Sequence, residues 1–175
     1  MAGAFRDWDH MYSEAFNHLR PGGYIEVVDI EPTDMIVQHS DTLYAEYQQA
    51  LIDASRQSGR TITLEHMLPA RLAAAGFESI KNEQIKVALG PWPPDSKKRS
   101  LGKLFLVCKL EGLEAEGLRL LTRYAGWTVE DVKKTCRDVQ AELMRGDHRL
   151  MTTVYVSLLT SFRSSFVLDD NPIGS

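Results

Sequence analysis

This sequence of 175 residues has only two cysteines, no long apolar run and no excess of positive charge. Cys108 and Cys136 show neither CxxC spacing nor a histidine at metal-ligand spacing, so we expect two free thiols and no metal site. No apolar stretch approaches the roughly 18 residues that a membrane span requires. The formal net charge of −4 provides no basic surface for a nucleic acid. We therefore expect neither a membrane nor a nucleic-acid partner.

The N-terminal residues MAGAFRDWDH also lack the charged, apolar and small-residue zones of a secretory signal peptide. Because free thiols persist in a reducing compartment, we expect a cytoplasmic protein. The remaining composition, with 43% hydrophobic and 25% charged residues, is ordinary for a globular protein, and the length fits one domain.

The stretch LRPGGYIEVVDIEP, residues 19–32, predicts the end of a helix, a tight turn and one apolar strand over 24–31. Gly22 and Gly23 can supply the positive φ that such a turn needs. The strand ends in Asp29 and Glu31, and α/β proteins commonly hold their sites at the carboxyl ends of buried strands. The alternative is that these two acids only cap the next loop.

The spacing of apolar residues predicts the other elements. Helices are expected over 5–19, 41–56, 63–75, 100–124 and 128–144, strands over 77–89 and 150–162, and a loop over 32–40. Pro69 limits the third helix, which could begin there. Gly102, Gly112 and Gly117 lie inside the fourth helix and indicate either bends or close packing against another backbone.

The run FRDWDHMYSEAFNHLRPGGYIEVVDIEP, residues 5–32, resembles the later half of fungal class I SAM-dependent methyltransferases of secondary metabolism. That family includes regulator-like methyltransferases and methyltransferase-fold cyclases. Further matches follow in the same order and cover nearly all of residues 1–157: SGR at 58–60, AAGFESI at 74–80, GPWPPD at 90–95, GLEAEGLRLLTRYAGWTVEDV at 112–132 and VYV at 154–156.

The resemblance implies an α/β fold: a partial, truncated class I methyltransferase-like sheet of about three strands with flanking helices and a helical lid insertion. It divides the chain into a partial Rossmann-like segment at 1–96, a helical lid at 97–147 and a last strand at 148–162. Residues 163–175 form an expected frayed tail. Residues 157–175 do not match the family's usual ending.

In that family, SAM rests on a glycine-rich loop after the first strand and on an acid at the end of the second. The sequence contains no GxGxG motif, and Gly22-Gly23 belongs to a turn. We therefore expect a methyltransferase-like protein without a SAM site and with no cofactor.

Three functions are compatible with this interpretation. The favoured one is a cofactor-independent cyclase, pericyclase or isomerase acting on a small apolar natural product such as a fungal polyketide. The alternatives are a non-catalytic partner or regulator of a full-length methyltransferase-like protein, and a fragment of a SAM-dependent methyltransferase. An unpaired edge on the strand 24–31 would favour a homodimer, or pairing with such a methyltransferase-like protein.

For the favoured function, Asp29, Glu31 and Arg123 are the candidate catalytic residues. The two acids could serve as a general base or orient a hydroxyl, and Arg123 could polarise a carbonyl. Aromatic side chains could form the walls of an apolar substrate pocket: Trp8, Trp92, Tyr124 and Trp127. His66 is a weaker acid/base candidate, which we expect to be exposed to solvent.

Overall fold

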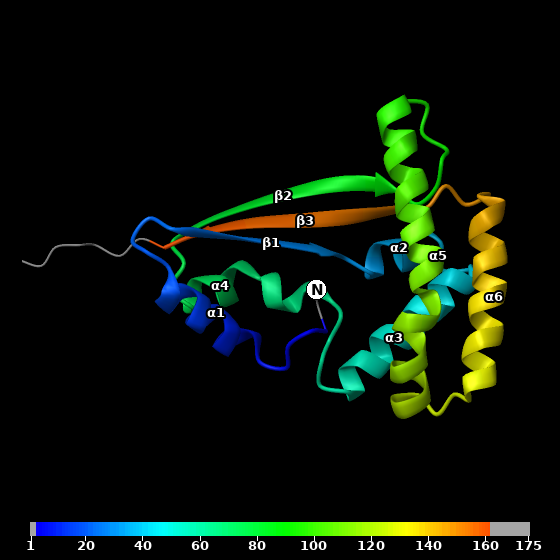
Figure 1. Ribbon diagram of the computed structural model, residues 1–175, viewed down its shortest axis with the longest axis horizontal. Helices are drawn as coiled ribbons and strands as arrows, with labels where there is room; N and C mark the ends of the chain where they lie inside the picture. Colours follow the sequence, from blue (N-terminus) through cyan, green and yellow to red (C-terminus); the bar gives the residue numbers. More distant parts are fainter. Residues whose placement is uncertain (1–2, 162–175) are drawn as a thin grey trace, which may run out of the picture.

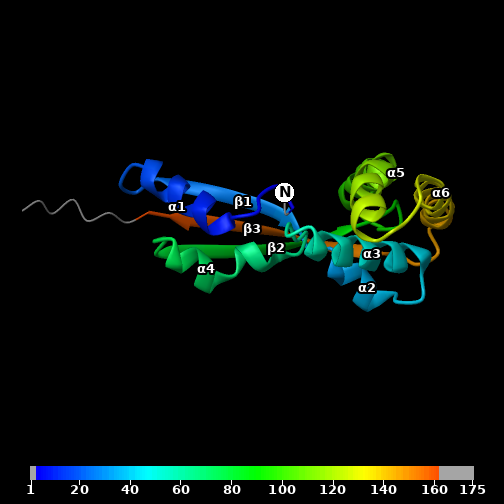
Figure 2. The ribbon, with the colours of Figure 1, turned by 90° about the horizontal axis from the view of Figure 1, so that it is seen from below.

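The computed structural model describes residues 3–161. Its strands run along the length of the molecule, with helices α1 and α4 on one face and a group of helices beyond the end of β1 (Figures 1 and 2). The elements in chain order are α1 (Trp8–His18), β1 (Tyr24–Ile30), α2 (Thr33–Gln38), α3 (Leu43–Gln57), the 3-10 helix η1 (Leu64–Met67), α4 (Pro69–Ala74), β2 (Ser79–Ala88), α5 (Ser96–Tyr124), α6 (Val129–Arg145) and β3 (Met151–Thr160).

The sheet has three strands in the order β1-β3-β2, and β3 is antiparallel to both neighbours. Tyr24 and Ser79 both pair with Thr160, so β1 and β2 are parallel to each other. β3, the last of these three strands in sequence, therefore joins the two earlier ones. This arrangement confirms the expected α/β fold with about three strands and flanking helices, and it is compatible with part of a methyltransferase-like sheet.

Two hydrophobic cores stabilise the molecule. The first lies between the sheet, α1 and α4, and its buried residues include Tyr12, Leu72 and Phe77. The second joins α3 to the long helices α5 and α6, and Leu51, Leu121 and Val139 contribute to it. The helices of the expected lid thus share a core with α3.

Two predicted segments differ from the structure. The loop expected over 32–40 contains the helix α2, which Pro32 precedes and which carries Asp34 in its first turn. The single helix expected over 63–75 is divided into η1 and α4, because Pro69 has no N–H to continue the first helix and instead begins the second. The remaining predicted elements match observed ones within a few residues.

Two of the three glycines of α5, Gly102 and Gly117, serve close packing, and α5 is one continuous helix. A side chain at position 102 would collide with the carbonyl oxygen of Gly90, and one at position 117 would collide with the hydroxyl of Tyr47. Of the two expectations, close approach to a neighbour is the one observed at Gly102 and Gly117, whereas Gly112 meets only the end of the Glu116 side chain.

The division of the chain at residues 96 and 147 stays a prediction, and the tail 163–175 lies outside the described residues. Within residues 3–161, no helix is long and apolar enough to cross a membrane.

Candidate functional site

A cavity of about 520 Å³ opens where β1 ends, between α2, α3 and α5. Its wall is mainly apolar and includes Ile30, Met35, Leu51, Ile62, Phe105 and Leu120. Its polar residues are Asp29, Tyr44, Gln48, Cys108, Lys109 and Glu116. A few polar groups in an apolar cavity are typical of a site for a small organic molecule.

Asp29 is the predicted acid that reaches this cavity. It is buried near the carboxyl end of β1, and its Oδ1 accepts a hydrogen bond from the backbone N–H of Ile30 at 3.0 Å. Its other oxygen, Oδ2, lies 3.6 Å from Nε2 of His66. The strand end therefore brings a carboxylate and an imidazole together beside the cavity.

His66 is fully buried, which contradicts the expectation that it is exposed. The helix η1 folds back against α1, and the imidazole stacks on Trp8 with ring centroids 3.9 Å apart. Burial lowers the pKa of His66 below its ordinary value of 6.5, although Asp29 acts in the opposite direction. The imidazole is therefore neutral at physiological pH.

Two residues of α3, Tyr44 and Gln48, contribute buried polar groups to the wall. They are four residues apart and so lie on the same face of the helix. The hydroxyl of Tyr44 and Nε2 of Gln48 are buried, and neither has a hydrogen-bond partner among the described residues. Burial raises the pKa of Tyr44 well above its ordinary value of 10, so its hydroxyl stays protonated and can donate.

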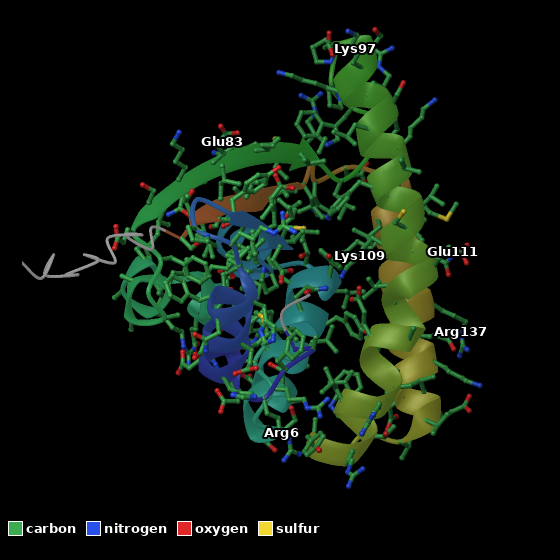
Figure 3. The ribbon with its side chains drawn as sticks, turned by 60° about the vertical axis from the view of Figure 1, so that its left-hand side comes forward. Arg6, Glu83, Lys97, Lys109, Glu111 and Arg137 are labelled. Carbon is green, nitrogen blue, oxygen red and sulfur yellow. The ribbon has the colours of Figure 1, made fainter. Side chains whose placement is uncertain are left out.

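Lys109 supplies a positive charge from α5 on the opposite wall. Its ammonium group pairs with Glu116 at 2.6 Å and lies 5.8 Å from the centre of the Tyr44 ring. Figure 3 shows Lys109 directed from α5 toward the middle of the molecule, whereas Glu111 on the same helix points away from it.

The two cysteines differ in access. Cys108 is exposed and contributes to the wall of the cavity, whereas Cys136 is buried in the helical core. Cys136 instead contacts the hydroxyl of Tyr47, with its Sγ at 3.8 Å. A thiol reagent should therefore reach Cys108 first.

Glu31, the second predicted acid, lies in a different place. Its Oε1 accepts hydrogen bonds from the backbone N–H and the hydroxyl of Thr33, at 3.0 Å and 2.7 Å. It contributes to a second, more polar cavity of about 490 Å³ over β2 and β3, which Asn82 and Tyr155 also line. The structure thus separates Glu31 from the cavity beside Asp29.

The other predicted site residues do not line the cavity beside Asp29. Arg123 is exposed, with its guanidinium 5.9 Å from the ring of Tyr124. Tyr124 and Trp127 pack against the helical core. Trp92 is half-buried, and its indole N–H is buried. The roles proposed for these four residues stay predictions.

Trp8, which the sequence suggested for the wall of a substrate pocket, does not line the cavity. It is buried in the core between α1 and the sheet, where it contacts the ring of Phe5 as well as that of His66. It therefore reaches the cavity only indirectly, by holding His66 beside Asp29.

Sequence reasoning did not identify Tyr44, Gln48 and Lys109 as site residues. On α3, Tyr44 has the helical spacing of a core residue, so the sequence does not show that it also lines the cavity. The one available signal is Gln48, a polar side chain on the apolar face of a predicted helix. Within residues 3–161, no three His, Cys, Asp or Glu side chains gather in a way that could hold a metal ion.

Comparisons with known proteins give a consistent family relationship. The chain is 33% identical over 150 residues to the methyltransferase pytC of Aspergillus terreus, covering 84% of this chain and 46% of that protein. It is 32% identical over 146 residues to the secondary metabolism regulator LAE1 of Cochliobolus heterostrophus, covering 81% and 48%. The regulator laeA of Aspergillus fumigatus is 27% identical over 144 residues, with 81% and 39% covered.

The chain therefore spans between 39% and 48% of the length of these curated relatives. No protein-family model matches it. The relationship to methyltransferase-like proteins of fungal secondary metabolism agrees with the resemblance found in the sequence.

Two short loops follow the carboxyl ends of the parallel strands β1 and β2. The loop after β1 is Glu31-Pro32, in which Pro32 has no backbone N–H to donate. The loop after β2 brings the carbonyl oxygen of Gly90 against Gly102 of α5. The expected lack of a SAM site stays a prediction.

Proposed function

We propose that this chain, which is related to the methyltransferase-like proteins of fungal secondary metabolism, binds a small, mainly apolar natural product and acts on it by proton transfer, without a methyl donor. The observation that carries the proposal is the apolar cavity of about 520 Å³ with Asp29 in its wall. Such a site suits an isomerase or cyclase acting on a polyketide-like compound.

The chemistry would rest on position and on one base. Apolar walls hold the substrate in a reactive shape, which contributes by orientation. The carboxylate of Asp29 would accept a proton from the bound compound and return it at another atom. His66, neutral and 3.6 Å from the carboxylate, would act as a positioning residue that keeps Asp29 directed toward the cavity.

The first experiment measures whether the cavity binds such a compound. Tetralin, a bicyclic hydrocarbon without polar groups, serves as the probe, and ligand-observed NMR follows its binding. Labelling the exposed Cys108 with N-ethylmaleimide should abolish binding, because the adduct occupies the mouth of the cavity. The matched control is the Cys108→Ser variant, which should still bind tetralin after the same treatment. Unchanged binding by the labelled wild type would contradict the proposed site.

The second experiment separates this function from methyl transfer. Calorimetric titration with SAM should give no heat of binding at micromolar concentrations. Micromolar binding would instead favour a methyltransferase-type function for the chain and contradict the proposal that no methyl donor is used.

A second candidate function, association with another chain, is favoured by β1. This strand forms one edge of the three-stranded sheet, and its side chains Tyr24 and Val28 are 67% and 45% exposed. Unpaired strand edges favour pairing with another strand. In antiparallel self-pairing centred on Val27, Glu26 would lie opposite Val28, so no like charges would meet. A homodimer through β1 is therefore the proposed assembly.

The mass in solution tests this assembly. Val28→Lys should convert a dimer to a monomer, whereas Val129→Lys, at a site 52% exposed at the start of α6, should not. Analytical ultracentrifugation measures both variants. A wild-type protein that is monomeric at high micromolar concentration would exclude the homodimer and leave a methyltransferase-like partner as the candidate for this edge.

A further inference from the structure

Two buried hydrogen-bond donors on α3 have no acceptor within residues 3–161, and a ligand could provide one. The hydroxyl of Tyr44 and Nε2 of Gln48 belong to almost fully buried residues of the cavity wall, and within residues 3–161 neither donor has a hydrogen-bond partner. Buried polar groups in proteins are nearly always hydrogen-bonded, so each exception requires an explanation. Two such exceptions lie four residues apart in the wall of the same cavity, and an acceptor on a bound ligand would explain both.

We propose that the natural ligand of this cavity is a carbonyl compound, whose oxygen accepts hydrogen bonds from Tyr44 and Gln48. This inference rests on the proposed function and adds the substrate class to it. The rest of the wall suits the carbon skeleton of such a compound, because it is mainly apolar. A ketone on an otherwise apolar ring or chain combines these two properties.

Lys109 brings a positive charge to the same wall. Its ammonium lies 5.8 Å from the centre of the Tyr44 ring, but it pairs with the carboxylate of Glu116, which offsets that charge. The hydrogen-bond donors of Tyr44 and Gln48 would therefore provide most of the stabilisation of negative charge on a bound oxygen. The base and the donors come from different elements: Asp29 from β1, Tyr44 and Gln48 from α3.

The corresponding step conserves atoms and electrons. The carboxylate of Asp29 takes a proton from the carbon next to the carbonyl, and the C–H bond electrons form a C=C bond. The carbonyl π electrons move to oxygen, giving an enolate that Tyr44 and Gln48 hold by hydrogen bonds. Return of the proton to carbon regenerates Asp29 and gives either the starting ketone or its isomer, without an oxidant or reductant.

Two probes of nearly equal shape test the inference. 1-Tetralone carries a carbonyl and an adjacent CH₂ group, and tetralin is the same bicycle without the carbonyl. The wild-type protein should bind 1-tetralone at least roughly tenfold more tightly than tetralin, because only the ketone satisfies the buried donors. NMR titration measures both dissociation constants.

Two variants assign this preference to the wall residues. Tyr44→Phe and Gln48→Met should each reduce the ratio of 1-tetralone affinity to tetralin affinity. Tyr12→Phe is the matched control, since the Tyr12 hydroxyl is also buried without a partner in the described part of the chain but Tyr12 does not line the cavity. It should retain the full preference for the ketone. Tyr44→Phe should also raise the melting temperature of the free protein, because it removes an unsatisfied donor, so its effects on stability and on ketone binding should be opposite.

Deuterium exchange tests the base separately. In D₂O, the protein should speed deuterium incorporation at the CH₂ next to the carbonyl of 1-tetralone, and Asp29→Asn should abolish this acceleration. A preference for the ketone without exchange would support the carbonyl site and contradict proton transfer by Asp29. Equal binding of both probes, unaffected by Tyr44→Phe, would overturn the inference but retain the apolar site. Binding of neither probe would overturn both.

Discussion

The buried carboxylate of Glu142 offers the sharpest test of how the helices hold the cavity. It lies on α6, yet its two oxygens accept hydrogen bonds from the backbone N–H groups of Leu43 and Tyr44, at 3.2 Å and 2.9 Å. These are the first amides of α3, which have no partner within their own helix. A residue 98 positions away thus caps the helix that carries Tyr44 into the cavity wall.

The expected loss in the free energy of unfolding follows from these two hydrogen bonds. Glu142→Gln retains one acceptor oxygen but places an NH₂ group against the other amide, and it removes a charge that favours the start of a helix. We expect a loss of about 2 kcal/mol in the free energy of unfolding. Glu142→Ala removes both acceptors and should cost about 4 kcal/mol. These are large fractions of a typical total of roughly 5–15 kcal/mol.

Urea unfolding followed by circular dichroism measures the loss, with Glu111→Gln as the control. Glu111 is exposed on α5 and points away from the molecule, so its substitution should change stability by less than about 0.5 kcal/mol (Figure 3). If Glu142→Gln costs no more than Glu111→Gln, the carboxylate does not hold α3. In the expected case, Glu142→Gln should also weaken the preference for 1-tetralone, since it loosens the turn that contains Tyr44.

Three further predictions concern packing, pH and capping. Gly117→Ala should destabilise the protein by about 1–3 kcal/mol, because the new methyl group would overlap the hydroxyl of Tyr47. Gly112→Ala in the same helix is the control: its methyl group meets only the flexible end of a side chain, so it should be neutral or stabilising. Thermal unfolding measures both variants. The pKa of His66 is lower in the folded protein than its ordinary 6.5, so the unfolded chain binds more protons just below pH 6.5. Protonation of this histidine should therefore leave the free energy of unfolding unchanged above pH 6.5 and lower it as the pH falls below 6.5. His66→Gln should reduce the difference between the free energies of unfolding measured by denaturation at pH 7.5 and at pH 5. Thr128→Ala removes the capping box of α6 and should cost about 1 kcal/mol in urea unfolding, and no loss would contradict the capping role.

Local signals in the sequence were sufficient for most elements. The spacing of apolar residues predicted the bounds of α6 to within one residue at each end, and the Pro-Gly-Gly turn predicted the start of β1. The helix α2 was missed although Pro32 and Asp34 are the start signals of a helix, because six residues are too short to show an apolar period. The start signals were therefore present in the sequence, but the helix was too short to be recognised from apolar spacing.

The site depended on contacts that no local pattern contains. Asp29 was predictable, because an acid at the carboxyl end of an apolar strand is a common position for a site residue. His66 was expected to be exposed, and it is buried because Trp8, 58 positions earlier in the chain, stacks on its ring. Tyr44 has the spacing of a core residue, and only the packing of α5 against α3 makes it part of a cavity wall.

The position of Asp29 on an edge strand connects the two proposed functions. Among residues 3–161, β1 pairs with β3 alone, so a strand added to its other side would hold the segment that carries Asp29 more rigidly. Self-pairing centred on Val27 would include Asp29 in the paired segment, opposite Ile25. A partner at this edge would therefore fix the backbone that directs the carboxylate, and association would precede efficient proton transfer. Binding at the edge and chemistry in the cavity would then be two properties of the same strand, so a variant such as Val28→Lys that separates the copies should also slow deuterium exchange of 1-tetralone.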